Sequence, residues 1–164
     1  MIRIQGNIDM GKGYNLEKFK NIIEQTITVI KEFTEIEQTK LDAAADENLT
    51  ALEGCMTKEQ AMILRVKGLE QERDKWQKKN GYGGMTFRQI LEQAEPAEKA
   101  ELQPLFDQLS GCLKTFQDVM KSAEQIIKTN LHTVNKKLEL RGMEYQRDGS
   151  TEKFVEGHLT DRKV

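Results

Sequence analysis

The stretch that decides the fold is residues 102–134, which read LQPLFDQLSGCLKTFQDVMKSAEQIIKTNLHTV. Apolar side chains recur here with the 3.5-residue period of a heptad repeat. One heptad position holds Leu102, Leu109, Phe116, Ala123 and Asn130, and the other holds Phe106, Leu113, Met120, Ile127 and Val134. A second apolar line beside them holds Leu105, Cys112, Val119 and Ile126. The pattern predicts one long helix that contacts more than one neighbour at the centre of a helical bundle.

Two further helices are predicted before this stretch. Apolar residues at helical spacing predict a first helix over residues 16–54, with Gly54 as its stop. Thr57 stands three residues before Gln60, the spacing of a capping box, and so predicts the start of a second helix. The glycine-rich run 80–84 would end that helix, because its residues tolerate positive φ.

The start of the long helix is also marked in the sequence. Thr86 can cap a short helix over residues 87–91, and Pro96 suits the first turn of the long helix, where its missing N–H costs nothing. Pro104 falls further in, where a proline kinks a helix at a cost of about 3 kcal/mol.

These elements predict an all-α fold, an elongated antiparallel bundle of long helices with coiled-coil-like packing. At 164 residues we expect a single domain. Within it, residues 1–14 are expected to be a flexible arm, residues 15–141 the bundle and residues 142–164 a flexible C-terminal tail.

Charge and hydropathy disfavour several classes of partner. The chain has 25 Lys and Arg against 27 Asp and Glu, interleaved along its length, for a net charge of −2. A nucleic-acid binder would show a basic face, and a membrane-bound protein would show a polybasic run or a long apolar span. We therefore expect a cytoplasmic protein with no nucleic-acid partner and no membrane insertion.

No motif supports an enzyme. Gly6, Gly11 and Lys12 have the spacing of a phosphate-binding loop, but Gly13 stands where a Ser or Thr must hold Mg²⁺. The sequence also predicts no strands to build the sheet that carries such loops. We expect no catalytic residue.

Metal and cofactor sites are not indicated either. Cys55 and Cys112 are far apart and lack a C-x-x-C spacing, and His132 and His158 have no partner at ligand spacing. We expect no metal ligand and no cofactor.

One apolar line continues past the heptad stretch toward the C-terminus. Leu131, Leu138 and Tyr145 are spaced by seven, and no predicted helix covers them. They could pack on the first helix or on the mate in a homodimer, or they could bind an amphipathic helix of another protein. The candidate partner-binding residues are Leu131, Val134, Leu138, Met143 and Tyr145.

Residues 49–76, LTALEGCMTKEQAMILRVKGLEQERDKW, resemble the FlgN family of flagellar export chaperones. The matching features are a Leu-rich step, a start at Thr57, Lys58 and Glu59, and an end at Leu69, Glu70, Glu72 and Arg73. Residues 86–91 resemble the family's short helix, and residues 102–140 resemble its long last helix.

The resemblance implies an all-α cytoplasmic chaperone. Such a protein binds the terminal helical segments of hook-associated proteins at the hook–filament junction, prevents their premature assembly and delivers them to the flagellar type III export gate. Family members bind substrate mainly through the C-terminal region. The alternative left open by the residues is a self-associating coiled-coil structural or adaptor protein without a secretion substrate.

Overall fold

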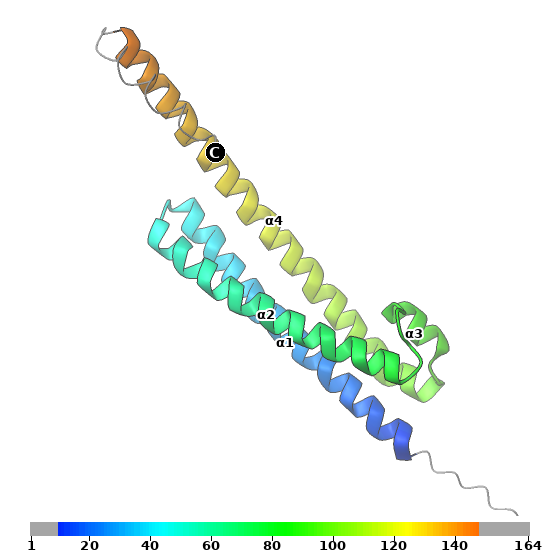
Figure 1. Ribbon diagram of the computed structural model, residues 1–164. Coiled ribbons are helices and arrows are strands. Elements are labelled where there is room, and N and C mark those ends of the chain that lie inside the picture. The colour runs from blue at the N-terminus through cyan, green and yellow to red at the C-terminus, as the bar shows by residue number, and fades with distance from the viewer. Residues whose placement is uncertain (1–9, 148–164) are drawn as a thin grey trace, which may run out of the picture. The chain divides into compact units, whose positions relative to one another are not determined.

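The computed structural model describes the backbone of residues 10–147 and the side chains of residues 16–142. It contains four helices, α1 (Met10–Ala45), α2 (Leu49–Lys79), α3 (Phe87–Gln93) and α4 (Pro96–Arg147), and no strand within the described residues. The predicted all-α bundle of long helices is therefore confirmed (Figure 1). The chain forms two compact units, residues 1–123 and 124–164, and each is described here by itself.

Both terminal helices extend further than the sequence suggested. α1 begins at Met10, inside the stretch 1–14 expected as an arm, and α4 ends at Arg147, inside the stretch 142–164 expected as a tail. Isolated glycines weaken a helix by only about 1 kcal/mol each, so Gly11 and Gly13 do not stop one. The division into arm, bundle and tail otherwise stays a prediction, and residues 1–9 and 148–164 lie outside the described residues.

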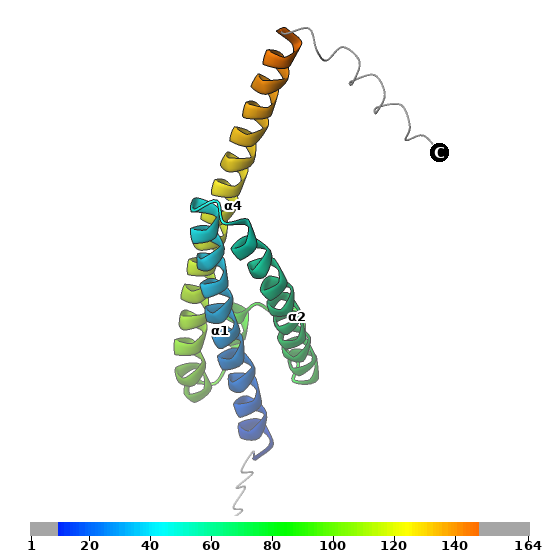
Figure 2. The same ribbon diagram turned by 90° about the vertical axis from the view of Figure 1, so that its left-hand side faces the viewer.

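In the first unit α1 and α2 run antiparallel, and the first part of α4 runs parallel to α1 (Figures 1 and 2). Ion pairs show the antiparallel register, because Lys40 pairs with Glu59 whereas the earlier Glu32 pairs with the later Arg65. The parallel register of α1 and α4 is set by two ring contacts and one ion pair, namely Phe19–Phe106, Phe33–Phe116 and Lys20–Glu101.

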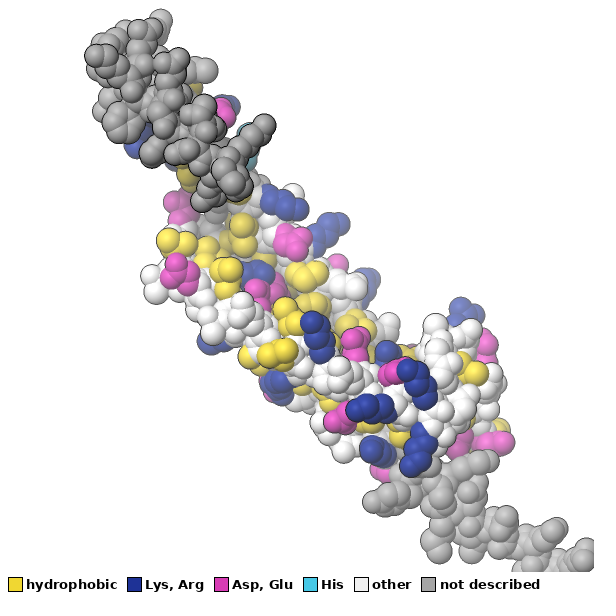
Figure 3. All heavy atoms as spheres, in the orientation of Figure 1, with side chains coloured by type: hydrophobic (Ala, Val, Ile, Leu, Met, Phe, Trp, Pro, Cys, Tyr) yellow, Lys and Arg dark blue, Asp and Glu magenta, His cyan; other side chains and the backbone are white. Residues whose placement is uncertain are grey.

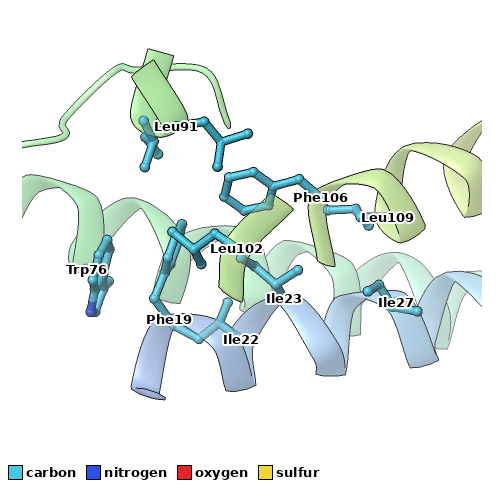
Figure 4. Packing of buried hydrophobic residues seen from close by; sticks show 10 residues of the cluster. Phe19, Ile22, Ile23, Ile27, Trp76, Leu91, Leu102, Phe106 and Leu109 are labelled. Atoms are coloured by element: carbon cyan, nitrogen blue, oxygen red, sulfur yellow. The ribbon is translucent and has the colours of Figure 1, made fainter. Parts of the chain in front are cut away.

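Phe19 lies at the centre of the core, with none of its surface exposed. Its ring stacks on Trp76 of α2 at a centroid distance of 4.0 Å and meets the edges of Phe87 of α3 and Phe106 of α4 at 6.5 and 6.1 Å. Figure 4 shows the α1 side chains pointing toward those of α4. The buried cluster comprises Phe19, Ile22, Ile23, Ile27, Trp76, Ile90, Leu91, Leu102, Phe106 and Leu109. All four helices therefore share one core.

The turn between α1 and α2 lies earlier than predicted, so Gly54 as the stop and Thr57 as the cap are both wrong. Asn48 caps α2, because its side chain accepts a hydrogen bond from the Ala51 N–H at 3.1 Å, and Glu47 before it takes a φ of 54°. Thr57 lies inside α2, where its hydroxyl donates to the Glu53 carbonyl oxygen. A capping box acts only where backbone N–H groups lack helical partners, and at Thr57 they already have them.

The later helix boundaries agree with those predicted from the sequence. Thr86 and Gln89 form a capping box at α3, and α4 begins at Pro96 and continues through Pro104. α2 ends before the run 80–84, in which Gly81 and Gly84 have φ of 82° and 73°.

A buried charge cluster joins α1 to α2 near the turn. Glu37 is 2% exposed, and the ammonium of Lys40 lies 2.8 Å from one oxygen of Glu37 and also pairs with Glu59. Burial raises the pKa of Glu37, and the carboxylate of Glu59 raises it further. Burial alone would lower the pKa of Lys40, because it disfavours the charged ammonium. The interactions of Lys40 with the carboxylates of Glu37 and Glu59 outweigh this effect and raise its pKa.

The cap assignment predicts different outcomes for two substitutions. Asn48→Ala should lower the free energy of unfolding by about 1 kcal/mol, because it removes the acceptor for the Ala51 N–H. Thr57→Ala should leave it unchanged or raise it slightly, because alanine is the better residue inside a helix. Urea unfolding followed by circular dichroism measures both, and a larger loss for Thr57→Ala would contradict the assignment.

The charge cluster predicts a pH-dependent difference in stability. The pKa of Glu37 is higher in the folded chain than in the unfolded chain. Its contribution to the free energy of unfolding is therefore present at low pH and is lost as pH rises through the raised pKa. Glu37→Gln removes that titration. Relative to the native chain, the variant should therefore gain stability as pH rises from the ordinary pKa of a glutamate through the raised pKa of Glu37. Urea unfolding across this range checks the sign, and a difference that does not change with pH would refute it.

Candidate functional site

The second unit presents large apolar side chains to solvent. Within residues 124–142 every side chain is exposed except those of Ile126 and Asn130, which are half-buried. Three of the predicted partner-binding residues lie here, with Leu131 59%, Val134 51% and Leu138 59% exposed. Met143 and Tyr145 belong to α4 by their backbone, but their side chains lie outside the described residues.

The exposed residues form one face of the helix. Ile127, Leu131, Val134 and Leu138 occur at steps of four, three and four, which place successive side chains on the same side at 100° per residue. We call these four residues the C-terminal stripe. Leu140, at 55% exposure, lies about 180° away from Leu131 on the same helix.

The stripe follows from the heptad repeat that builds the core. In the first unit, residues of the same repeat such as Leu102, Phe106 and Leu109 are buried, at 2%, 5% and 4% exposure. In the second unit the repeat continues, but Ile127 and Val134 are 36% and 51% exposed. Burying a Leu, Ile or Val side chain contributes about 1.5–3 kcal/mol, so an amphipathic helix laid on the stripe would gain substantial free energy.

The structure contains a further exposed apolar set that sequence reasoning missed. Leu49, Met56 and Ile63 on α2 are 68%, 58% and 43% exposed, and hydrophobic side chains gather over the N-terminal half of α2 in Figure 3. The spacing of seven between these residues is a signal that the sequence did carry. The sequence alone does not show that these residues are exposed, because a spacing of seven is the same whether or not another helix covers the residues.

The described residues gather no group of side chains suited to catalysis. No set of three or more His, Cys, Asp or Glu within them could hold a metal ion. Gly11 and Lys12, part of the near match to a phosphate loop, lie in helix α1, and Gly6 lies outside the described residues. Cys55 is buried and Cys112 half-buried, both as free thiols. Of the helices that the structure describes, none has both the length and the apolarity needed to cross a membrane.

Comparison with protein-family models matches residues 10–152 to the family described as FlgN protein. The matched residues include all four helices and therefore parts of both units. Comparisons with curated proteins and with solved structures found no match.

The exposure of the stripe predicts that it contributes little to the stability of the free protein. Leu131→Ala should change the free energy of unfolding by less than about 0.5 kcal/mol. Leu109→Ala, at a buried position of the same helix, should cost about 2–5 kcal/mol, because it leaves a cavity in the core. Urea unfolding of the two variants checks the contrast, and equal losses would show that Leu131 is packed in the folded chain.

Proposed function

The chain belongs to the FlgN family of flagellar export chaperones, and from this premise we propose that it binds the terminal helical segments of hook-associated proteins. Binding would take place at the C-terminal stripe. Leu131, Val134 and Leu138 would supply the central contacts, and Met143 and Tyr145 would continue the line toward the end of α4.

The exposure of the stripe is the observation that carries this proposal. Leu131 and Leu138 are each 59% exposed and lie on one face at a spacing of seven. A helical segment with apolar residues at the same period can cover both, as in other helix-to-helix recognition. Exposed leucines arranged in this way are typical of a surface that awaits a partner.

The proposed substrate explains why binding is useful. Terminal segments that are disordered before assembly expose apolar residues, and a chaperone that covers them prevents premature assembly at the hook–filament junction. Ordering such a segment costs free energy on binding, which keeps the complex weak enough to release. The chaperone would act in the cytoplasm and deliver its substrate to the flagellar type III export gate.

The proposal involves no catalysis and no cofactor. FlgN proteins are chaperones rather than enzymes, and the binding of an apolar segment needs only the surface described. Nucleic acid and membrane insertion have no part in the proposed role. A homodimer formed through the stripe would be the self-associating adaptor, and it would compete with substrate for the same residues.

Two leucines on opposite faces of α4 test the binding site. Leu131→Glu should weaken the binding of a hook-associated terminal segment at least about tenfold, because it places a charge in the apolar contact. Leu140→Glu makes the same change at similar exposure on the opposite face, and should alter the dissociation constant by less than about twofold. Titration calorimetry with the full chain and the segments from its source organism measures both.

Two results would contradict the proposal. One is the absence of binding to any hook-associated terminal segment by a folded native chain. The other is a native dimer that Leu131→Glu dissociates, seen in sedimentation at concentrations where substrate does not bind, since that result favours the adaptor.

A further inference from the structure

The charges around the C-terminal stripe differ from those of the chain as a whole. Residues 124–142 contain four Lys or Arg and two Glu, a local charge of +2 in a chain whose net charge is −2. The four cations are Lys128, Lys136, Lys137 and Arg141. This basic segment therefore coincides with the exposed apolar face.

Three of the four cations border the stripe. At 100° per residue, Lys137 and Arg141 fall on one edge of it, where no carboxylate of residues 124–142 lies. Lys128 falls on the other edge, together with Glu124 and Glu139. Lys136 points to the opposite side of the helix. In helix pairs these edge positions carry the charges that decide which partner binds and in which direction.

Some cations of the first unit form ion pairs with nearby carboxylates, although others there, such as Lys67 and Lys99, form none within the described residues. Lys20, Lys40, Arg65 and Lys78 each lie within 4.0 Å of a carboxylate oxygen. None of the four cations of residues 124–142 has such a pair with a carboxylate of the described residues. All four are exposed, so their charges face solvent or an arriving partner.

We infer that the segment bound by the stripe is an acidic amphipathic helix, with Asp or Glu on the side of its apolar residues that meets Lys137 and Arg141. This inference rests on the proposed function and specifies the chemistry of its substrate. Carboxylates at that edge would meet two cations and no carboxylate of residues 124–142. Opposite charges at the rim of an interface raise the association rate and reject partners of like charge.

An anionic membrane surface could also attract a basic amphipathic helix. The observations favour a helical protein segment, because Glu124 and Glu139 lie on the same helix and the whole chain carries a negative net charge. Both carboxylates lie on the Lys128 edge and would face an anionic bilayer that receives the whole apolar stripe, whereas a helix can place its carboxylates on the Lys137 and Arg141 edge alone.

Two designed peptides test the inference with the full chain. Both have the same leucine heptads, and their edge positions carry either glutamate or lysine. Fluorescence anisotropy should show the glutamate peptide binding at least about tenfold more tightly in about 50 mM salt, and the preference should shrink in about 500 mM salt. Equal affinities of the two peptides would overturn the inference.

Neighbouring lysines supply the matched variants. Lys137→Glu should weaken binding of the glutamate peptide about fivefold, because it reverses a charge at the edge of the stripe. Lys136→Glu makes the same change on the opposite side and should alter the affinity by less than about twofold. Equal effects of the two variants would mean that only the net charge matters, which contradicts recognition at the edges.

Titration of the hook-associated terminal segments on the same variants separates this inference from the proposed function. If those segments bind and Leu131→Glu abolishes binding, but neither salt nor Lys137→Glu has an effect, the charge inference fails and the proposed function stands. If they do not bind at all, the proposed function fails, while the peptide pair still reports the preference of the surface. Tighter binding to phosphatidylserine vesicles than to the glutamate peptide would overturn the inference in favour of a membrane surface.

Discussion

The packing of Phe19 against three other helices is the contact on which the first unit depends. Its ring stacks on Trp76 and meets Phe87 and Phe106 edge to face, and it is completely buried. One side chain of α1 thus fixes the registers of α2, α3 and α4 together. Only 37% of the residues are hydrophobic. Because one aromatic side chain contacts three helices at once, a small number of apolar residues is enough to pack four helices together.

The same repeat serves two purposes along α4. Leu102 and Phe106 are buried in the first unit, while Ile127 and Val134 of the same repeat are 36% and 51% exposed in the second. The interior of the first unit uses the apolar face for stability, whereas in the second unit that face is exposed. Under the proposed function, this separation would let substrate bind and leave without disturbing the core.

Local signals in the sequence predicted some boundaries and missed others. The predicted cap at Thr86 is confirmed, and the structure adds that Gln89 completes a capping box there. The cap at Asn48 was missed because Thr57 and Gln60 have the spacing of a capping box, whereas Ala51 stands three residues after Asn48 and completes no such box. Only the pairing of α2 with α1 decides between the two positions. Membership of the family followed from the order of the elements rather than from any single motif.

The period of the candidate site was predicted from the sequence, which left open whether its apolar line is covered or exposed. Leu131 and Leu138 were identified by a spacing of seven, which Leu102 and Leu109 share while being buried. A heptad shows which face of a helix is apolar, and only the arrangement of the other helices shows where that face is covered. For the same reason Leu49 and Met56 on α2 went unrecognised.

Hydrogen–deuterium exchange on the full chain, with and without a hook-associated terminal segment, tests the central claim most directly. We predict that the segment slows amide exchange in residues 124–142, because a bound helix covers the stripe there and holds that part of α4 in helical form. Exchange in α1 and α2 should change much less. Slowed exchange confined to α1 and α2, or no change anywhere at saturating segment, would contradict the account.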